Sequence, residues 1–176
     1  GYPMGRTEPI AGTDDSLFIK SNGGLYLTTG TTYARWVHGT PAGRDGVVLN
    51  GRLIFIAYAE EHGIEPWISD GTRSGTYGLA DLNEGPGHSQ PEAFVCVGDR
   101  VLFRANDGKH GPEIYLTDGT WEGTVLVQDL NPAEGVGLNP TPVKVIGEDR
   151  LLFSADDGQR GRELWLLRLS DNSVPA

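Results

Sequence analysis

The chain has 176 residues and a formal net charge of −10, and 26 glycines and 11 prolines interrupt a sequence that is 38% hydrophobic. Its acidity disfavours nucleic acid as a partner, because phosphate backbones carry charge of the same sign. The sequence contains no run of 18 apolar residues, so it predicts no membrane-spanning helix. Abundant glycine and proline favour short strands joined by tight turns over helices.

The sequence repeats itself as a single domain over residues 1–176, and its units of about 48 residues lie at approximately 9–44, 45–91, 92–141 and 142–169. The second and third copies align almost without gaps, so Phe55 and Phe103 stand 48 residues apart. The first copy keeps Phe18 but lacks the acidic residues of the unit. The fourth reads Arg168, Leu169 and Ser170 where the others have Asp-Gly-Thr. We therefore expect the first and last copies to be incomplete.

One unit predicts four antiparallel strands. In the third copy, runs rich in β-branched and aromatic residues cover 91–98, 101–107, 112–119 and 123–130, each bounded by turn residues. A fixed position of the third strand is aromatic, and we expect it to pack between neighbouring sheets; it is occupied by Tyr26, Trp67, Tyr115 and Trp165. The prediction is an all-β, β-propeller-like array of about four four-stranded blades. A β-sandwich is the rival architecture, but it does not require the same turn chemistry every 48 residues.

The number of predicted strands, about fifteen, is one short of four complete blades. Residues 2–7 could supply the missing outer strand and close a four-bladed ring. Two chains could instead join into a larger ring, or this chain could be one part of a longer array. The sequence leaves these alternatives open.

Several motifs resemble those of the bacterial ELWxxDGT-repeat proteins. They are ELW at Glu163–Trp165, SDGT at Ser69–Thr72, TDGTWEGT at Thr117–Thr124 and VLVQDLNP at Val125–Pro132. The resemblance covers about residues 13–169. It implies β-propeller-like arrays in large, often secreted or surface-associated bacterial proteins, with no assigned reaction. From the resemblance we expect an extracellular or cell-surface location in a bacterium.

The repeated D-G-T-x-x-G-T loop joins the third and fourth strands of a unit. Its aspartate can accept hydrogen bonds from amides of the loop, and the next glycine can adopt positive φ. We therefore interpret Asp70 and Gly71, with Asp118 and Gly119, as structural turn residues.

The loop between the second and third strands is acidic in the later copies. Calcium prefers several oxygen ligands, which these loops could supply from Asp107, Glu113, Asp156, Asp157 and Glu163. No loop has the D-x-D-x-D-G spacing of a dedicated calcium loop, so turn formation is the competing interpretation. Calcium is the one cofactor that the sequence suggests.

Trp121 and Trp36 fall outside the repeated aromatic position, so they are candidate contacts for a partner protein or glycan. The single cysteine, Cys96, lies in the apolar run AFVCV and is predicted to be buried. No nucleophile, zinc-protease or phosphate-loop motif is present. We therefore expect a non-enzymatic binding or adhesion module. The alternatives are a structural scaffold completed by another chain and, third, a hydrolase domain.

Overall fold

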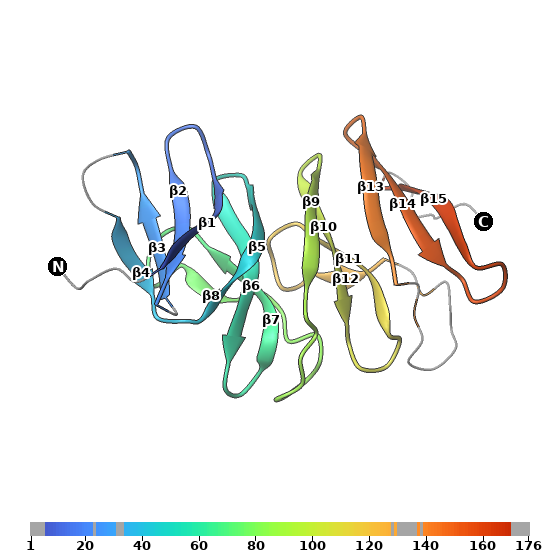
Figure 1. Ribbon diagram of the computed structural model, residues 1–176, viewed down its shortest axis with the longest axis horizontal. Coiled ribbons are helices and arrows are strands. Elements are labelled where there is room, and N and C mark those ends of the chain that lie inside the picture. Colours follow the sequence, from blue (N-terminus) through green and yellow to red (C-terminus); the bar gives the residue numbers. More distant parts are fainter. Residues whose placement is uncertain are drawn as a thin grey trace.

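The computed structural model describes residues 6–22, 24–30, 34–127, 129, 137 and 139–169. Over these residues the chain forms fifteen strands, grouped in four antiparallel sheets, and no helix (Figure 1). In the part of the chain so described, no helix has the length and apolar character needed to cross a membrane. The predicted all-β class is confirmed.

We call the sheets blades 1 to 4 in chain order, and within each blade the strands also follow chain order. The strands of blades 1 and 2 are β1 (Thr7–Gly12), β2 (Leu17–Ser21), β3 (Gly24–Thr28), β4 (Arg35–His38), β5 (Ala42–Leu49), β6 (Arg52–Ala59), β7 (Gly63–Ser69) and β8 (Thr76–Gly78). Those of blades 3 and 4 are β9 (Glu92–Val97), β10 (Arg100–Asn106), β11 (Pro112–Thr117), β12 (Val125–Leu126), β13 (Thr141–Ile146), β14 (Arg150–Asp156) and β15 (Arg162–Arg168).

Blade 1 has four strands although its copy has lost part of the motif, and the total of fifteen strands over the described residues agrees with the predicted number. Its ladders consist of backbone hydrogen bonds, which do not need the acidic residues that the first copy has lost. Blade 4 has three strands over the described residues, in agreement with the expectation for the last copy.

Blade 1 also differs from the others in register. Phe55 pairs with Trp67 across β6 and β7, whereas the equivalent Tyr26 pairs with Ile19 and not with Phe18. Ile19, and not Phe18, is therefore the structural equivalent of Phe55, and the sequence alignment of Phe18 is wrong by one residue. Because a shift of one residue turns a side chain to the other face of a sheet, Phe18 packs toward blade 2.

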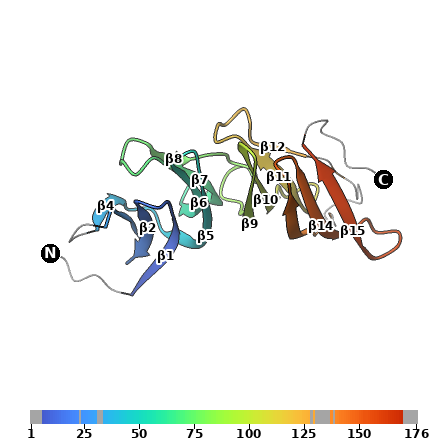
Figure 2. The ribbon, with the colours of Figure 1, turned by 90° about the horizontal axis from the view of Figure 1, so that it is seen from above.

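The blades stack in chain order through their first strands: β1 contacts β5, β5 contacts β9, and β9 contacts β13. Figure 2 shows β1, β5 and β9 on one side of the row and the outer strands β8 and β12 on the other. Blades 1 and 4 lie at opposite ends in both views (Figures 1 and 2). Thr7 belongs to β1, far from blade 4, which contradicts the idea that residues 2–7 complete that blade; residues 2–5 lie outside the described residues.

The core lies between the blades. Phe55, Phe103 and Phe153 are fully buried, and each pairs across strands with the aromatic residue of the third strand. The rings of Phe103 and Tyr115 stack with their centres 5.8 Å apart. The prediction that these aromatics pack between sheets is confirmed for blades 2 to 4, where they border the three apolar clusters.

The prediction that Cys96 is buried is wrong, since its side chain is exposed. Cys96 stands beside the turn between β9 and β10, where the carbonyl oxygen of Val48 approaches its Sγ to 3.6 Å. Its neighbour Val97 faces the other way and is buried.

Candidate functional site

The D-G-T loop of blade 3 is held by its own side chains. Asp118 Oδ1 accepts hydrogen bonds from the Thr120 amide at 2.9 Å and the Thr120 hydroxyl at 2.6 Å. The Thr120 hydroxyl oxygen accepts from the Gly123 amide at 3.0 Å, and the Thr124 hydroxyl donates to the Thr120 carbonyl at 2.6 Å. Gly119 has φ of +88°, a conformation that favours glycine. The loop is therefore held by hydrogen bonds among its own residues.

The loop of blade 2 has the same arrangement. Asp70 Oδ1 accepts from the Thr72 amide at 2.8 Å and the Thr72 hydroxyl at 2.6 Å, and Gly71 has φ of +83°. These hydrogen bonds favour the ionised carboxylate, so the pKa values of Asp70 and Asp118 are below the usual range. Both aspartates have the contacts that a structural turn requires.

Trp121 stands in the loop of blade 3 with 59% of its surface exposed, the largest exposed fraction of any described tryptophan, and its carbonyl accepts the Thr124 amide at 3.1 Å. Trp36 lies on β4 of blade 1, 45% exposed, with the Arg73 guanidinium 5.6 Å from its ring centre. The two predicted contact residues belong to different blades, so the structure does not bring them together.

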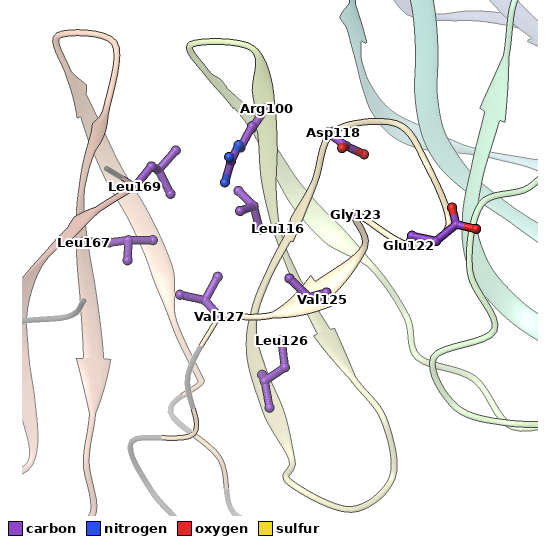
Figure 3. Close-up of a pocket in the computed structure, with 10 residues that line it drawn as sticks. All are labelled: Arg100, Leu116, Asp118, Glu122, Gly123, Val125, Leu126, Val127, Leu167 and Leu169. Atoms are coloured by element: carbon purple, nitrogen blue, oxygen red, sulfur yellow. The ribbon is translucent and has the colours of Figure 1, made fainter. Parts of the chain in front are cut away.

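Beside the Trp121 loop, a cavity of about 210 Å³ opens between blades 3 and 4 (Figure 3). We call it the seam pocket. Its lining is mainly aliphatic, with one cation and two carboxylates, and comprises Arg100, Leu116, Asp118, Glu122, Gly123, Val125, Leu126, Val127, Leu167 and Leu169.

The seam pocket exists because the fourth copy departs from the repeat. Where blades 2 and 3 meet, Gly119 of the D-G-T loop lies so close to blade 2 that an added Cβ would be 3.3 Å from Ile68 Cδ1. Leu79 is buried at that junction. In blade 4, Leu169 stands where Gly119 stands in blade 3 and no D-G-T sequence follows. The space that such a loop would fill is therefore open.

Arg100 gives the seam pocket its positive charge. In blade 2 the equivalent Arg52 donates a hydrogen bond to the Tyr77 hydroxyl at 2.9 Å, but blade 3 has Val125 in place of that tyrosine. Figure 3 shows Arg100 between the side chains of Leu169 and Asp118. A guanidinium beside an aliphatic cavity can bind a carbonyl or carboxylate of a ligand whose apolar part fills the cavity.

The residues of the calcium hypothesis are divided between two blades. Asp107 Oδ1 accepts the amides of Lys109 and His110, both at 2.9 Å, and its Oδ2 lies 2.6 Å from His110 Nδ1. Asp156 and Asp157 accept amides of their own loop in the same way. These loop carboxylates therefore make the contacts expected of turn formers.

The glutamate of the same motif is buried in blades 2 and 3, at Glu65 and Glu113, and half-buried at Glu163. Glu65 accepts hydrogen bonds from the Leu82 amide at 3.0 Å, the Ser89 amide at 2.8 Å and the Ser89 hydroxyl at 2.6 Å. It thereby anchors the connection that leads to blade 3. In the described ranges no three His, Cys, Asp or Glu side chains converge as metal ligands would, and calcium binding stays a prediction.

Sequence reasoning singled out Trp121 but missed the aliphatic wall of the seam pocket. Leu116, Val127 and Leu167 look like ordinary strand residues in the sequence, and only their neighbours decide whether they line a cavity. The one available signal was the replacement of Asp-Gly-Thr at residues 168–170.

No protein-family model matches the chain, and no curated protein matches it. Among solved structures the fold is similar to one from a study of two prolyl endopeptidases, with a TM-score of 0.59 and 14% identity over 92% of this chain. It is also similar to the putative TolB of Agrobacterium tumefaciens (TM-score 0.54, 13% identity, 97% of this chain) and to AztD of Citrobacter koseri (0.56, 18%, 97%). The chain spans 24%, 61% and 46% of those three chains.

At these identities the likeness concerns the fold. Four-stranded antiparallel sheets that stack through their first strands, with the fourth strands outermost, define a β-propeller-type module. In this module the seam pocket is lined in part by the outer strand β12 and by the D-G-T loop that precedes it.

Proposed function

We propose that the chain is a non-enzymatic binding module that holds a segment of another protein against the seam pocket and the Trp121 loop. The observation that carries the proposal is Trp121 itself, a large aromatic side chain left exposed at the tip of a loop whose backbone is fixed by hydrogen bonds. Tryptophan is enriched among the residues that dominate the energy of protein interfaces, and a rigid loop loses little entropy on binding.

The seam pocket supports a protein ligand. Its wall of leucine and valine side chains suits an apolar side chain of the partner, and Arg100 can bind a main-chain carbonyl or carboxylate beside it. Three residues of the Trp121 loop, Asp118, Glu122 and Gly123, also line the pocket, so the loop and the pocket are continuous. One partner segment can therefore contact both.

An exposed tryptophan ring also suits a sugar ring, so a glycan is the second class of ligand to test. The resemblance to ELWxxDGT-repeat proteins supports a setting outside the bacterial cell or at its surface, where either ligand class is present.

The test is a binding screen of the whole chain against a peptide library and a glycan array, followed by calorimetry with any ligand found. We expect a peptide ligand, with affinity reduced at least tenfold by Trp121→Ala and by Leu169→Asp. Tyr58→Ala is the matched control, since Tyr58 is an exposed aromatic residue of blade 2 outside the seam pocket. Equal affinity in all three variants would contradict the proposed site, and binding of glycans alone would contradict the proposed ligand class.

A further inference from the structure

Each interior blade has two apolar faces. The back face packs on the preceding blade and the front face on the following one. Three back-face positions alternate along the second strand of each blade, and all are at most 1% exposed; they are Leu53, Phe55 and Ala57 in blade 2, Val101, Phe103 and Ala105 in blade 3, and Leu151, Phe153 and Ala155 in blade 4. The aromatic residue of the third strand lies opposite the phenylalanine.

Blade 1 has the same back-face pattern, but no described blade packs on that face. Because Ile19 pairs with Tyr26 as Phe55 pairs with Trp67, Leu17, Ile19 and Ser21 occupy the three back-face positions. Leu17 is 37% exposed and Ile19 and Tyr26 are half-buried, while Ser21, at the inner end of the strand, is 2% exposed. The pattern of a leucine, a large apolar residue, a small residue and an aromatic is thus kept on a face on which no other described blade packs.

Blade 4 has the complementary face. In blade 3 the front-face residues Leu102, Ile114 and Leu116 are at most 6% exposed, because blade 4 covers them. The residues 50 positions later are Leu152, Leu164 and Leu166. Leu164 is 68% exposed, the highest exposed fraction of any large apolar side chain in the described residues, and the other two are half-buried.

We propose that the front face of blade 4 packs on the back face of blade 1 of a second copy of this chain. The contact repeats the packing of aliphatic on aromatic side chains that already joins blades 2 to 3 and 3 to 4. A head-to-tail contact of this kind forms a closed ring when the rotation between copies permits it, and otherwise an open filament.

Two copies are the number that closes the ring. Blades 1 and 4 of one chain lie at opposite ends of the row, so four blades do not close on themselves (Figures 1 and 2). Propellers have about 4–8 blades, and two chains of four blades reach the upper end of that range while three chains exceed it. This inference does not depend on the proposed binding at Trp121, which lies outside both end faces.

The test is the mass in solution by light scattering of the full chain. We expect twice the chain mass of 18.9 kDa, and a monomer for Leu164→Asp and for Leu17→Asp. Val125→Asp is the control, because Val125 is an exposed aliphatic strand residue outside both end faces and should leave the dimer unchanged. Circular dichroism checks that each variant is folded, and both substituted leucines are already exposed in the monomer.

A mixture of the two monomeric variants distinguishes head-to-tail packing from packing of like faces. Leu164→Asp keeps an intact back face and Leu17→Asp an intact front face, so we expect the mixture to form a heterodimer. A wild-type monomer at high micromolar concentration, an assembly larger than two chains, or a Leu17→Asp variant that stays dimeric would each overturn the proposal. A changed mass in Trp121→Ala would also overturn it, because that residue serves only the proposed binding site.

Discussion

The α-carbon of Gly123 rests against the carboxylate of Asp118, so closely that an added Cβ would lie 2.1 Å from Oδ1. Gly75 has the same relation to Asp70 in blade 2, also at 2.1 Å. The second glycine of the D-G-T-x-x-G-T loop is therefore required by the space that the aspartate occupies, and not by its φ angle.

Gly123→Ala should force Asp118 away from the Thr120 amide and hydroxyl. We expect the free energy of unfolding to fall by about 1–3 kcal/mol, the usual cost of inserting a carbon into a packed site. Urea titration followed by fluorescence measures the change. Gly78→Ala is the control, because its added carbon would meet nothing nearer than 3.9 Å. Equal stability of the two variants would show that the loop tolerates the carbon.

Glu65→Ala should destabilise the chain strongly. The substitution leaves the part-buried Leu82 amide without its acceptor, and an unsatisfied donor of this kind costs about 1–3 kcal/mol. It also removes the bonds from the Ser89 hydroxyl and amide, although that amide keeps the Ile64 carbonyl at 3.1 Å. We expect a loss of about 3 kcal/mol in the free energy of unfolding, measured by urea titration. Glu60→Ala, an exposed glutamate of the same blade, should stay within about 0.5 kcal/mol of wild type. If Glu65→Ala lowered the free energy of unfolding no more than Glu60→Ala does, the hydrogen bonds of Glu65 would not be needed to hold the connection to blade 3.

The stability that depends on Glu65 should also vary with pH. Burial raises the pKa of Glu65 above its ordinary value of 4.5, against the opposing effect of its hydrogen bonds. A carboxyl with a raised pKa binds protons more tightly in the folded state, so its contribution is largest below the ordinary value and is lost as pH rises through the raised one. The stability difference between wild type and Glu65→Gln should therefore be larger at about pH 4 than at about pH 7. An opposite trend in urea titrations at the two pH values would mean that the hydrogen bonds outweigh burial.

Cys96 should react with a disulfide reagent in the folded protein. Its side chain is exposed, but partial burial raises the pKa of the thiol, so the reactive thiolate is scarce at neutral pH. We expect one thiol per chain to react under native conditions, more slowly than free cysteine at pH 7 and with a rate that rises with pH. Reaction only after addition of urea would contradict the exposed position. Cys96→Ser, which has no thiol, is the control and should not react with the reagent.

Much of the fold could be predicted from the sequence because the same pattern of strands and turns recurs in several copies. The equivalence of Phe55 and Phe103 in the aligned copies, and the turns at Asp70 and Asp118, depend on local patterns that one unit already contains. The orientation of Phe18 could not be predicted in this way. It depends on which residue of β2 faces Tyr26, and the length of the hairpin loop in the first copy sets that register.

The candidate site was less predictable than the fold. Trp121 could be identified because it is an aromatic residue outside the repeated aromatic position. The seam pocket, in contrast, is a space between side chains of two blades, and no single residue of the sequence indicates it. Cys96 illustrates the same limit, since the apolar run around it indicates a strand but not how far the neighbouring blade covers that strand.

Each blade is built from one uninterrupted stretch of chain, and the connection that leaves its outer strand leads directly to the inner strand of the next. A duplication of one unit in the gene would therefore insert a whole blade with both of its faces, and a deletion would remove one, without disturbing the strand order elsewhere. Changes in gene length of one unit at a time are thus a route by which rings of different size can arise from the same few packing residues.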